Sequence, residues 1–160
     1  MGLIKNGAIV EDTWQHVSED GELPAGDVIV GLGRYTAERD ALLSRDGKLG
    51  VKLTAEDQPD ALEKDLGKLA LVAIEFPKYA DGRGYSTARL LRDRHGFAGE
   101  LRAVGDVLRD QLLYMKRCGF DAYELKEGKD IEGALEAFGE LTVAYQGEAG
   151  DSRALFRRRA

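Results

Sequence analysis

Apolar and amphipathic stretches alternate along residues 49–145, and this alternation predicts repeated strand and helix units. The predicted strands cover residues 50–53, 69–76, 100–104, 122–125 and 141–145. The predicted helices between them cover residues 59–66, 86–95, 107–118 and 131–138. Strands that are separated by single helices pair in parallel through right-handed crossovers, so these units predict a mostly parallel sheet.

The N-terminal segment has a different pattern. Two short apolar runs within residues 3–10 flank Asn6 and Gly7, a dipeptide that tolerates the positive φ angles of a tight turn, and they predict a β-hairpin. Further along, Thr36 is predicted to cap a short helix that ends at Leu43.

Together these patterns predict one α/β domain over residues 1–150, with a mostly parallel sheet of about five strands and the hairpin appended. Residues 1–46 hold the hairpin and a connecting segment, and residues 47–146 hold the core of βα repeats. Residues 151–160 are predicted to form a basic flexible tail. A half (β/α)8 barrel is the main alternative, because consecutive βα units suit both architectures.

Cofactor and metal chemistry have little support in the sequence. The single cysteine, Cys118, excludes an internal disulfide and a site built from cysteines alone, and it is expected to be buried. His16, in a predicted loop, and His95, in the last turn of a helix, have no neighbouring metal-ligand residues. Gly31 and Gly33 resemble the start of a dinucleotide motif, but the third glycine is missing. We therefore expect no cofactor and no metal.

Composition limits the environment and the partners. A chain of 160 residues with 43% hydrophobic and 32% charged residues fits a soluble globular protein. No signal-peptide pattern and no membrane-spanning apolar run is seen, so a cytoplasmic protein is expected. The net charge of −6 argues against nucleic-acid binding. Residues 78–117, however, carry nine Lys and Arg residues against five acids. They form either solvated helix faces or a positive field for an anion or an acidic partner.

The loop between the predicted strand 69–76 and the next helix holds the most suggestive chemistry. The strand is expected to end at Pro77 and the helix to start near Ser86, which would direct free backbone N–H groups at an oxyanion such as sulfite, sulfate or phosphate. The expected anion-binding residues are Lys78, Arg83, Gly84, Tyr85, Ser86 and Arg109. The candidates for an acid or base are Glu75, Asp81 and Asp106. The alternatives are a glycine-rich turn with an ion pair between Asp81 and Arg83, and a helix-capping role for Asp106.

Three segments resemble an uncharacterised bacterial family. They are residues 75–86 (EFPKYADGRGYS), 99–111 (GELRAVGDVLRDQ) and 117–121 (RCGFD), and the similarity covers residues 30–145. Members of the family are encoded beside genes for sulfite reductase and are labelled oxidoreductases of sulfite reduction. The resemblance implies a redox role, although the sequence has no cysteine pair or complete dinucleotide motif to carry electrons.

The interpretation that combines residues and resemblance is an accessory protein of assimilatory sulfite reduction. Such a protein would bind a small oxyanion, or dock on sulfite reductase through the basic segment 78–117. One alternative is a cofactor-free enzyme that acts on a small anionic substrate with one of the acids named above. The other is a structural interaction protein without a small ligand.

Overall fold

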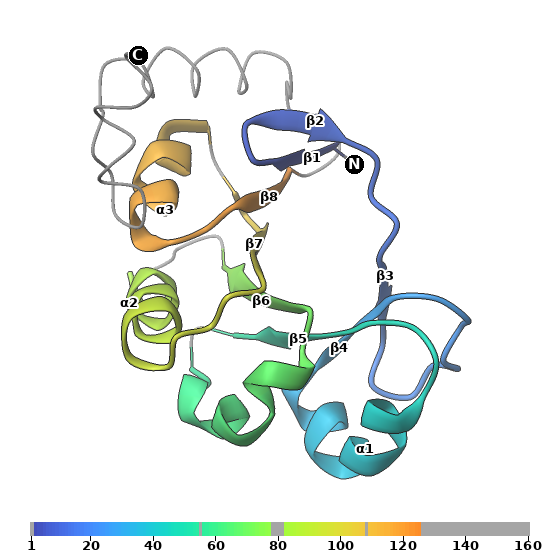
Figure 1. Cartoon of the computed structure of the whole chain (residues 1–160). Helices are drawn as coiled ribbons and strands as arrows, with labels where there is room; N and C mark the ends of the chain where they lie inside the picture. The colour runs from blue at the N-terminus through green and yellow to red at the C-terminus, as the bar shows by residue number, and fades with distance from the viewer. Residues whose placement is uncertain (1, 55, 78–81, 108, 126–160) are drawn as a thin grey trace.

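In the computed structural model, residues 2–54, 56–77, 82–107 and 109–125 are described. The predicted elements 131–138 and 141–145 and the basic tail lie outside these residues. The described strands are β1 (Gly2–Lys5), β2 (Ala8–Val10), β3 (Gln15–Val17), β4 (Val28–Gly31), β5 (Leu49–Leu53), β6 (Leu71–Phe76), β7 (Glu100–Gly105) and β8 (Ala122–Leu125). They form one sheet in the order β2-β1-β8-β7-β6-β5-β4-β3 (Figure 1).

The prediction of about five strands is wrong, because the described residues alone form eight. Strands β3 to β8 are parallel, and β1 pairs antiparallel with β8, so the hairpin extends the sheet. Strand β3 lies in the segment predicted as a connection. Its side chains are exposed or only partly buried, so it lacks the apolar alternation by which a strand is recognised. The hairpin itself is confirmed, with Asn6 and Gly7 at φ 52° and 79°.

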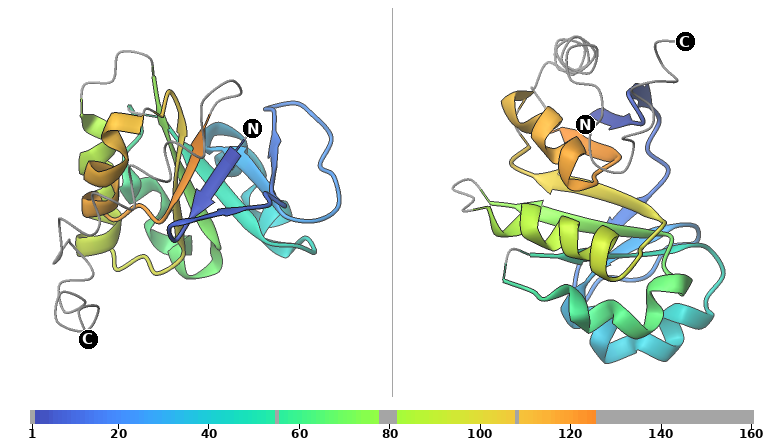
Figure 2. Two further views of the ribbon diagram at one scale, coloured as in Figure 1. Left: turned by 90° about the horizontal axis from the view of Figure 1, so that it is seen from above. Right: turned by 60° about the vertical axis from the view of Figure 1, so that its left-hand side comes forward.

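The strand order identifies the architecture. From β3 to β8 each strand lies beside its neighbour in sequence, and right-handed crossovers that always step in one direction place every helix on the same face. A doubly wound sheet would reverse direction. The alternative prediction, a half-barrel, is therefore correct. The helical segments are α1 (Leu32–Ser44), η1 (Pro59–Lys68), α2 (Arg83–Arg89) with η2 (Leu90–Arg94), and η3 (Arg109–Gln111) with α3 (Leu112–Cys118), and they lie along the outer face (Figure 2).

One contact across the inner face measures how strongly the sheet curls. His16 on β3 and Glu124 on β8 have four strands between them, so a flat sheet would hold them roughly 24 Å apart at about 4.8 Å per strand. In the structure His16 Nε2 lies 3.0 Å from both carboxylate oxygens of Glu124. The two edges of the parallel sheet therefore face each other across a concave surface.

The starts of α1 and α2 differ from the predictions. Helix α1 begins at Leu32, and Thr36 lies inside it, where its hydroxyl donates to the carbonyl of Leu32 over 2.9 Å. Helix α2 begins at Arg83 rather than near Ser86. Gly82 adopts φ +94°, a left-handed conformation that only glycine adopts readily, and this turn lets the helix start earlier than expected.

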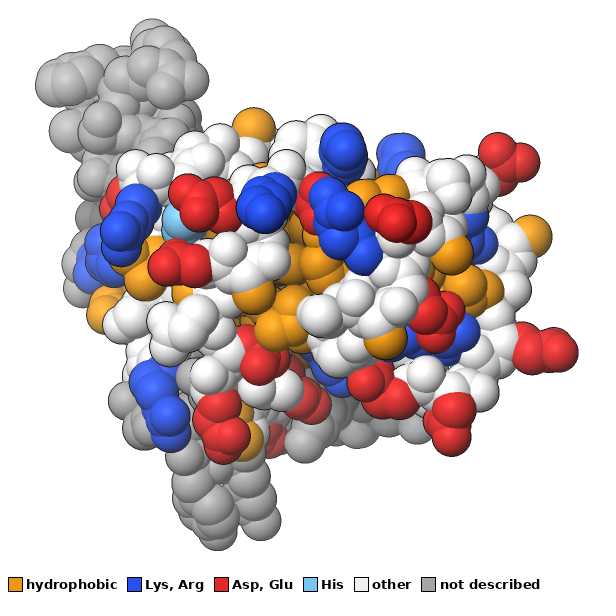
Figure 3. Space-filling view, turned by 90° about the horizontal axis from the view of Figure 1, so that it is seen from below, with side chains coloured by type: hydrophobic (Ala, Val, Ile, Leu, Met, Phe, Trp, Pro, Cys, Tyr) orange, Lys and Arg blue, Asp and Glu red, His pale blue; other side chains and the backbone are white. Residues whose placement is uncertain are grey.

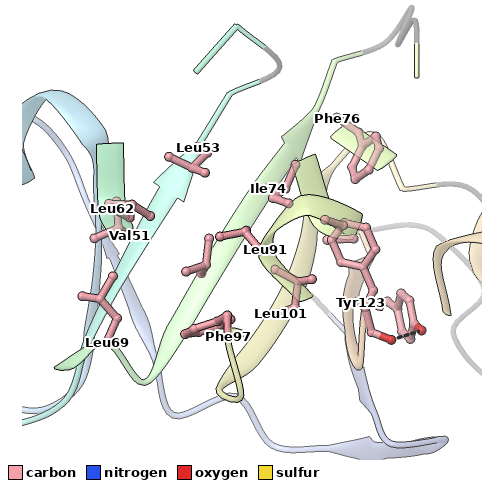
Figure 4. Close-up of a cluster of buried hydrophobic side chains, with 14 of the residues drawn as sticks. Val51, Leu53, Leu62, Leu69, Ile74, Phe76, Leu91, Phe97, Leu101 and Tyr123 are labelled. Atoms are coloured by element: carbon pink, nitrogen blue, oxygen red, sulfur yellow. Dashed lines mark hydrogen bonds between the residues drawn. The ribbon is translucent and has the colours of Figure 1, made fainter. Parts of the chain in front are cut away.

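The main core lies between the helices and the outer face of the sheet. The surface seen in Figure 3 carries interspersed acidic and basic side chains around small apolar patches. In this core, Leu62 and Leu91 from the helical layer pack against strand residues that include Val51 and Ile74 (Figure 4). On the concave face a second apolar cluster consists of Ile29, Leu71, Ala73 and Val104, with Trp14 packed against it.

Candidate functional site

Two of the predicted anion-binding residues are used in packing. A Cβ atom on Gly84 would lie 2.7 Å from the ring of Phe76, so the glycine allows α2 to approach β6 closely. The Tyr85 ring lies between aromatic neighbours, with ring centroids 5.1 Å from Phe76 and 4.8 Å from Tyr114. Burial raises the pKa of the Tyr85 hydroxyl, as expected for a ring in such a cluster. These contacts account for Gly84 and Tyr85 without a ligand.

The remaining residues of the predicted oxyanion site are only partly described. Arg83 and Ser86 are exposed on α2. Lys78 and Asp81 lie outside the described residues, as does the side chain of Arg109. An oxyanion site on this loop therefore stays a prediction.

Asp106 occupies a tight turn after β7. Its backbone N–H donates to the carbonyl of Phe76 over 2.7 Å, and Gly105 before it adopts φ +89°. The next helical segment begins at Arg109 rather than at residue 107, so Asp106 lies two residues ahead of the capping position. The capping role and the acid or base role of Asp106 both stay predictions.

A hollow opens where strands β3 to β6 end. In folds of repeated βα units this carboxyl edge is where ligands bind, because successive loops converge there. The hollow has a volume of about 810 Å³. The polar side chains that line it are Ser18, Glu19, Thr36, Lys52, Thr54, Asp57 and Glu75. We call it the carboxyl-end hollow.

Lys52 and Glu75 are the two charged strand residues of this hollow. Lys52 on β5 lies opposite Ala73 on β6, and Glu75 follows two residues later, so both side chains are on the concave face as diagonal neighbours. Both are half-buried. Within the described part of the chain, neither head group has a hydrogen bond or an ion pair. Glu75, one of the three predicted acid or base candidates, thus lines a hollow, whereas Asp81 lies outside the described residues.

Two other acids of the hollow, Asp57 and Glu19, are positioned by contacts of their own. Asp57 accepts hydrogen bonds from the backbone N–H and the hydroxyl of Thr54, over 2.9 and 3.1 Å. The Glu19 carboxylate oxygens lie 2.8 and 2.7 Å from the points where Cβ atoms would stand on Gly31 and Gly33. The two glycines that resembled a dinucleotide motif therefore make room for the protein's own carboxylate at the start of α1.

A second group of charges on the concave face is fully paired, and we call it the ion network. Arg102, only 1% exposed, contacts Glu100 over 2.9 Å, Asp12 over 3.0 Å and Glu124 over 3.1 Å. Lys5 on β1 adds a contact of 2.9 Å to Glu100. The ion network links β1, β7 and β8 to one another. Asp12 joins it to the segment before β3, and the contact of His16 with Glu124 joins it to β3 itself.

The charges of the ion network support one another. Burial disfavours the charged form of Arg102, but the carboxylates, first of all Glu100, outweigh burial and raise the pKa of its guanidinium. Burial likewise opposes ionisation of Glu124, but hydrogen bonds and charges from His16 and Arg102 outweigh it and lower the pKa of this carboxyl group. Glu124 is therefore held ionised.

Sequence analysis missed this network, and it placed His16 in a loop without partners. The available signal was the order Glu100-Leu101-Arg102 in a strand, which puts two opposite charges on one face of an otherwise apolar element.

Cations from the basic segment gather at another hollow, of about 490 Å³, between α2 with η2 and the end of α3. We call it the basic hollow. The cations that line it are Arg89, Arg92, Lys116 and Arg117, against the acids Asp93 and Asp121. Arg92 is held in place, since it donates to the carbonyls of Phe97, Gly99 and Gly119 over 2.8 to 2.9 Å.

Cys118 is buried at the edge of the basic hollow, as predicted. Burial raises the pKa of its thiol, although Arg89 acts in the opposite direction. A thiol with a raised pKa is a poor nucleophile at neutral pH. The cysteine therefore serves packing.

Comparison with known proteins gives a family but no activity. A family model described as a bacterial protein of unknown function, DUF934, matches residues 50–156. No curated protein matches the chain. In the described ranges, no helix has the length and apolar character needed to cross a membrane, and no group of three or more His, Cys, Asp and Glu side chains could hold a metal ion.

Proposed function

We propose that this protein, which belongs to the bacterial DUF934 family, is an accessory factor of assimilatory sulfite reduction. In this role it docks on sulfite reductase through the basic hollow. The role in sulfite reduction rests on the resemblance of the chain to proteins encoded beside sulfite reductase genes. The choice of docking surface rests on one observation. Two cations from α2 and η2 and two from α3 surround a single hollow, whose lining includes two acids among the described residues.

The chemistry of the basic hollow fits acidic side chains of a protein partner. Arginine binds carboxylates through two parallel hydrogen bonds, and an excess of positive charge speeds the encounter with an acidic surface. Arg92 is held by three backbone carbonyls and by an ion pair with Asp121 over 3.7 Å, so it shapes the hollow, and the exposed Arg89 on α2 is the cation best placed to meet a partner. The basic hollow is thus a prepared surface on an otherwise acidic protein of net charge −6.

Charge reversal at the basic hollow tests this proposal. The binding of purified sulfite reductase is measured for the wild type, for Arg89→Glu and for the matched control Lys64→Glu, an exposed lysine on η1. We expect Arg89→Glu to weaken binding by about tenfold or more, with the effect fading at high salt, and Lys64→Glu to leave binding unchanged. Equal binding by both variants, or an absence of binding by the wild type, would contradict docking at this surface.

Alternatively, the protein could serve sulfite reduction by binding a small oxyanion at the loop before α2. The exposed Arg83 and Ser86 at the start of this helix favour it. Thermal unfolding in sulfite, sulfate, phosphate and chloride at matched ionic strength measures such binding. A rise in Tm that is specific for sulfite and is lost in Arg83→Ala would support the loop. A rise that persists in Arg83→Ala would place the anion elsewhere.

A further inference from the structure

In the carboxyl-end hollow, two opposite charges lie near each other, and neither has a partner in the described part of the chain. Lys52 and Glu75 lie on neighbouring strands and on the same face, yet their head groups are farther apart than the 4.0 Å of an ion pair. Both side chains are only partly buried, so water still reaches their head groups, and neither charge is used by a neighbour among the described residues. Two opposite charges held near each other on rigid strands in one hollow are a suitable position for a third group that carries both charges.

The neighbours of Lys52 leave room on one side of it. Ala73, its partner in register on β6, has a small side chain, whereas the space over Gly31, its partner on β4, holds the Glu19 carboxylate, 2.8 Å from where a Cβ atom would stand. Glu75 lies two residues beyond Ala73, nearer the strand ends, and lines the same hollow. A small molecule can therefore reach both head groups from the carboxyl edge of the sheet.

The charge of the lining selects the class of ligand. A simple anion would gain Lys52 but would approach Glu19, Asp57 and Glu75. A simple cation would meet the repulsion of Lys52. A ligand with one negative and one positive group a few ångströms apart satisfies Lys52 and Glu75 together and adds no net charge to the hollow.

We propose that the carboxyl-end hollow binds a small zwitterion of the α-amino acid type, with its carboxylate on Lys52 and its ammonium group on Glu75. The hydroxyls of Ser18, Thr36 and Thr54 line the same hollow and are available to the ligand's polar side chain. This site is separate from the basic hollow and does not depend on the proposed docking function.

Three sets of probes test the charge requirement on the full chain. The probes are the common L-α-amino acids, their N-acetyl derivatives, which lack the ammonium group, and their amides, which lack the carboxylate. Thermal unfolding and isothermal titration calorimetry measure binding. We expect at least one amino acid to bind, and its N-acetyl derivative and its amide to bind at least tenfold more weakly. Binding of no amino acid, or equal binding of either derivative, would overturn the proposal.

Variants locate the site. Lys52→Met and Glu75→Gln should each weaken the binding of the same amino acid at least tenfold. The matched controls are Lys48→Met, just before the opposite end of β5, and Glu63→Gln on η1, and both should bind as the wild type does. Circular dichroism and Tm of the unliganded variants confirm folding. Unchanged binding in Lys52→Met and Glu75→Gln would overturn the assignment of the site.

Discussion

The ion network and the carboxyl-end hollow occupy the same concave face of one sheet, but their charges are arranged in opposite ways. Arg102 contacts three carboxylates and is 1% exposed, whereas Lys52 is half-buried and has no partner among the described residues. A fully buried charge must be paired to be tolerated, so the network belongs to the architecture of the half-barrel. Unpaired charges near the strand ends have no such structural explanation, and they are better explained by a ligand.

The largest effect should come from the centre of the ion network. Replacement of Arg102 by Met leaves Glu100, Glu124 and Asp12 facing one another without their shared cation. We expect the free energy of unfolding to fall by about 3–5 kcal/mol, as measured by urea denaturation. The control Arg94→Met changes an exposed arginine and should leave the urea midpoint unchanged. A loss below about 1 kcal/mol for Arg102→Met would show that the network is not structural.

The ion network should also make stability depend on pH. The pKa of Glu124 is lowered in the folded protein from its ordinary value of 4.5. Its ionisation therefore stabilises the fold above that value, and this contribution is lost as the pH falls through the folded pKa. We expect Glu124→Gln to be clearly less stable than the wild type at pH 7, by about 1–3 kcal/mol. The difference should shrink steadily below pH 4.5.

Urea denaturation of both proteins at several pH values measures this difference. A gap that stays constant between neutral and acidic pH would mean that the carboxylate charge contributes nothing, and that Glu124 acts only through its shape.

A smaller effect is expected at the edge of the network. His16→Ala removes the contact with Glu124 that holds β3 against the far side of the curled sheet. His16 is 35% exposed, so we expect a loss of only about 0.5–1.5 kcal/mol. Hydrogen exchange should accelerate at the amides of β3 and not at those of the central strand β6. Faster exchange in both strands alike would show that the contact is not local to the edge.

Local signals were enough to predict the hairpin and the strand β8 from the sequence. Asn6 and Gly7 favour a tight turn by themselves, and three of the four residues in 122–125 (Ala-Tyr-Glu-Leu) have apolar or aromatic side chains. The choice between a doubly wound sheet and a half-barrel needed the strand order, which depends on contacts between distant segments. His16 and Glu124 are 108 residues apart, and nothing in either local pattern indicates that they meet.

The carboxyl-end hollow was not predicted from the sequence. Glu75 was named only as a candidate acid or base beside the loop before α2, because it lies near the end of a strongly apolar strand where functional residues of α/β proteins gather, and that role stays a prediction. Lys52 was missed because one lysine between Val51 and Leu53 is ordinary for a strand with one polar face. Only the register, which sets the small side chain of Ala73 beside Lys52 and places Glu75 diagonally across from it, reveals that the two charges share one hollow.

The smallest effects on stability should come from the carboxyl-end hollow. These effects distinguish it most clearly from the ion network. Because Lys52 and Glu75 do not contact each other, Lys52→Met and Glu75→Gln should each change the free energy of unfolding by no more than about 0.5 kcal/mol. Their double-mutant cycle should give a coupling energy near zero without ligand. A coupling of about 1 kcal/mol or more would mean that the two residues pair in solution. The hollow would then be a second ion network, and the reason to place a ligand between Lys52 and Glu75 would disappear.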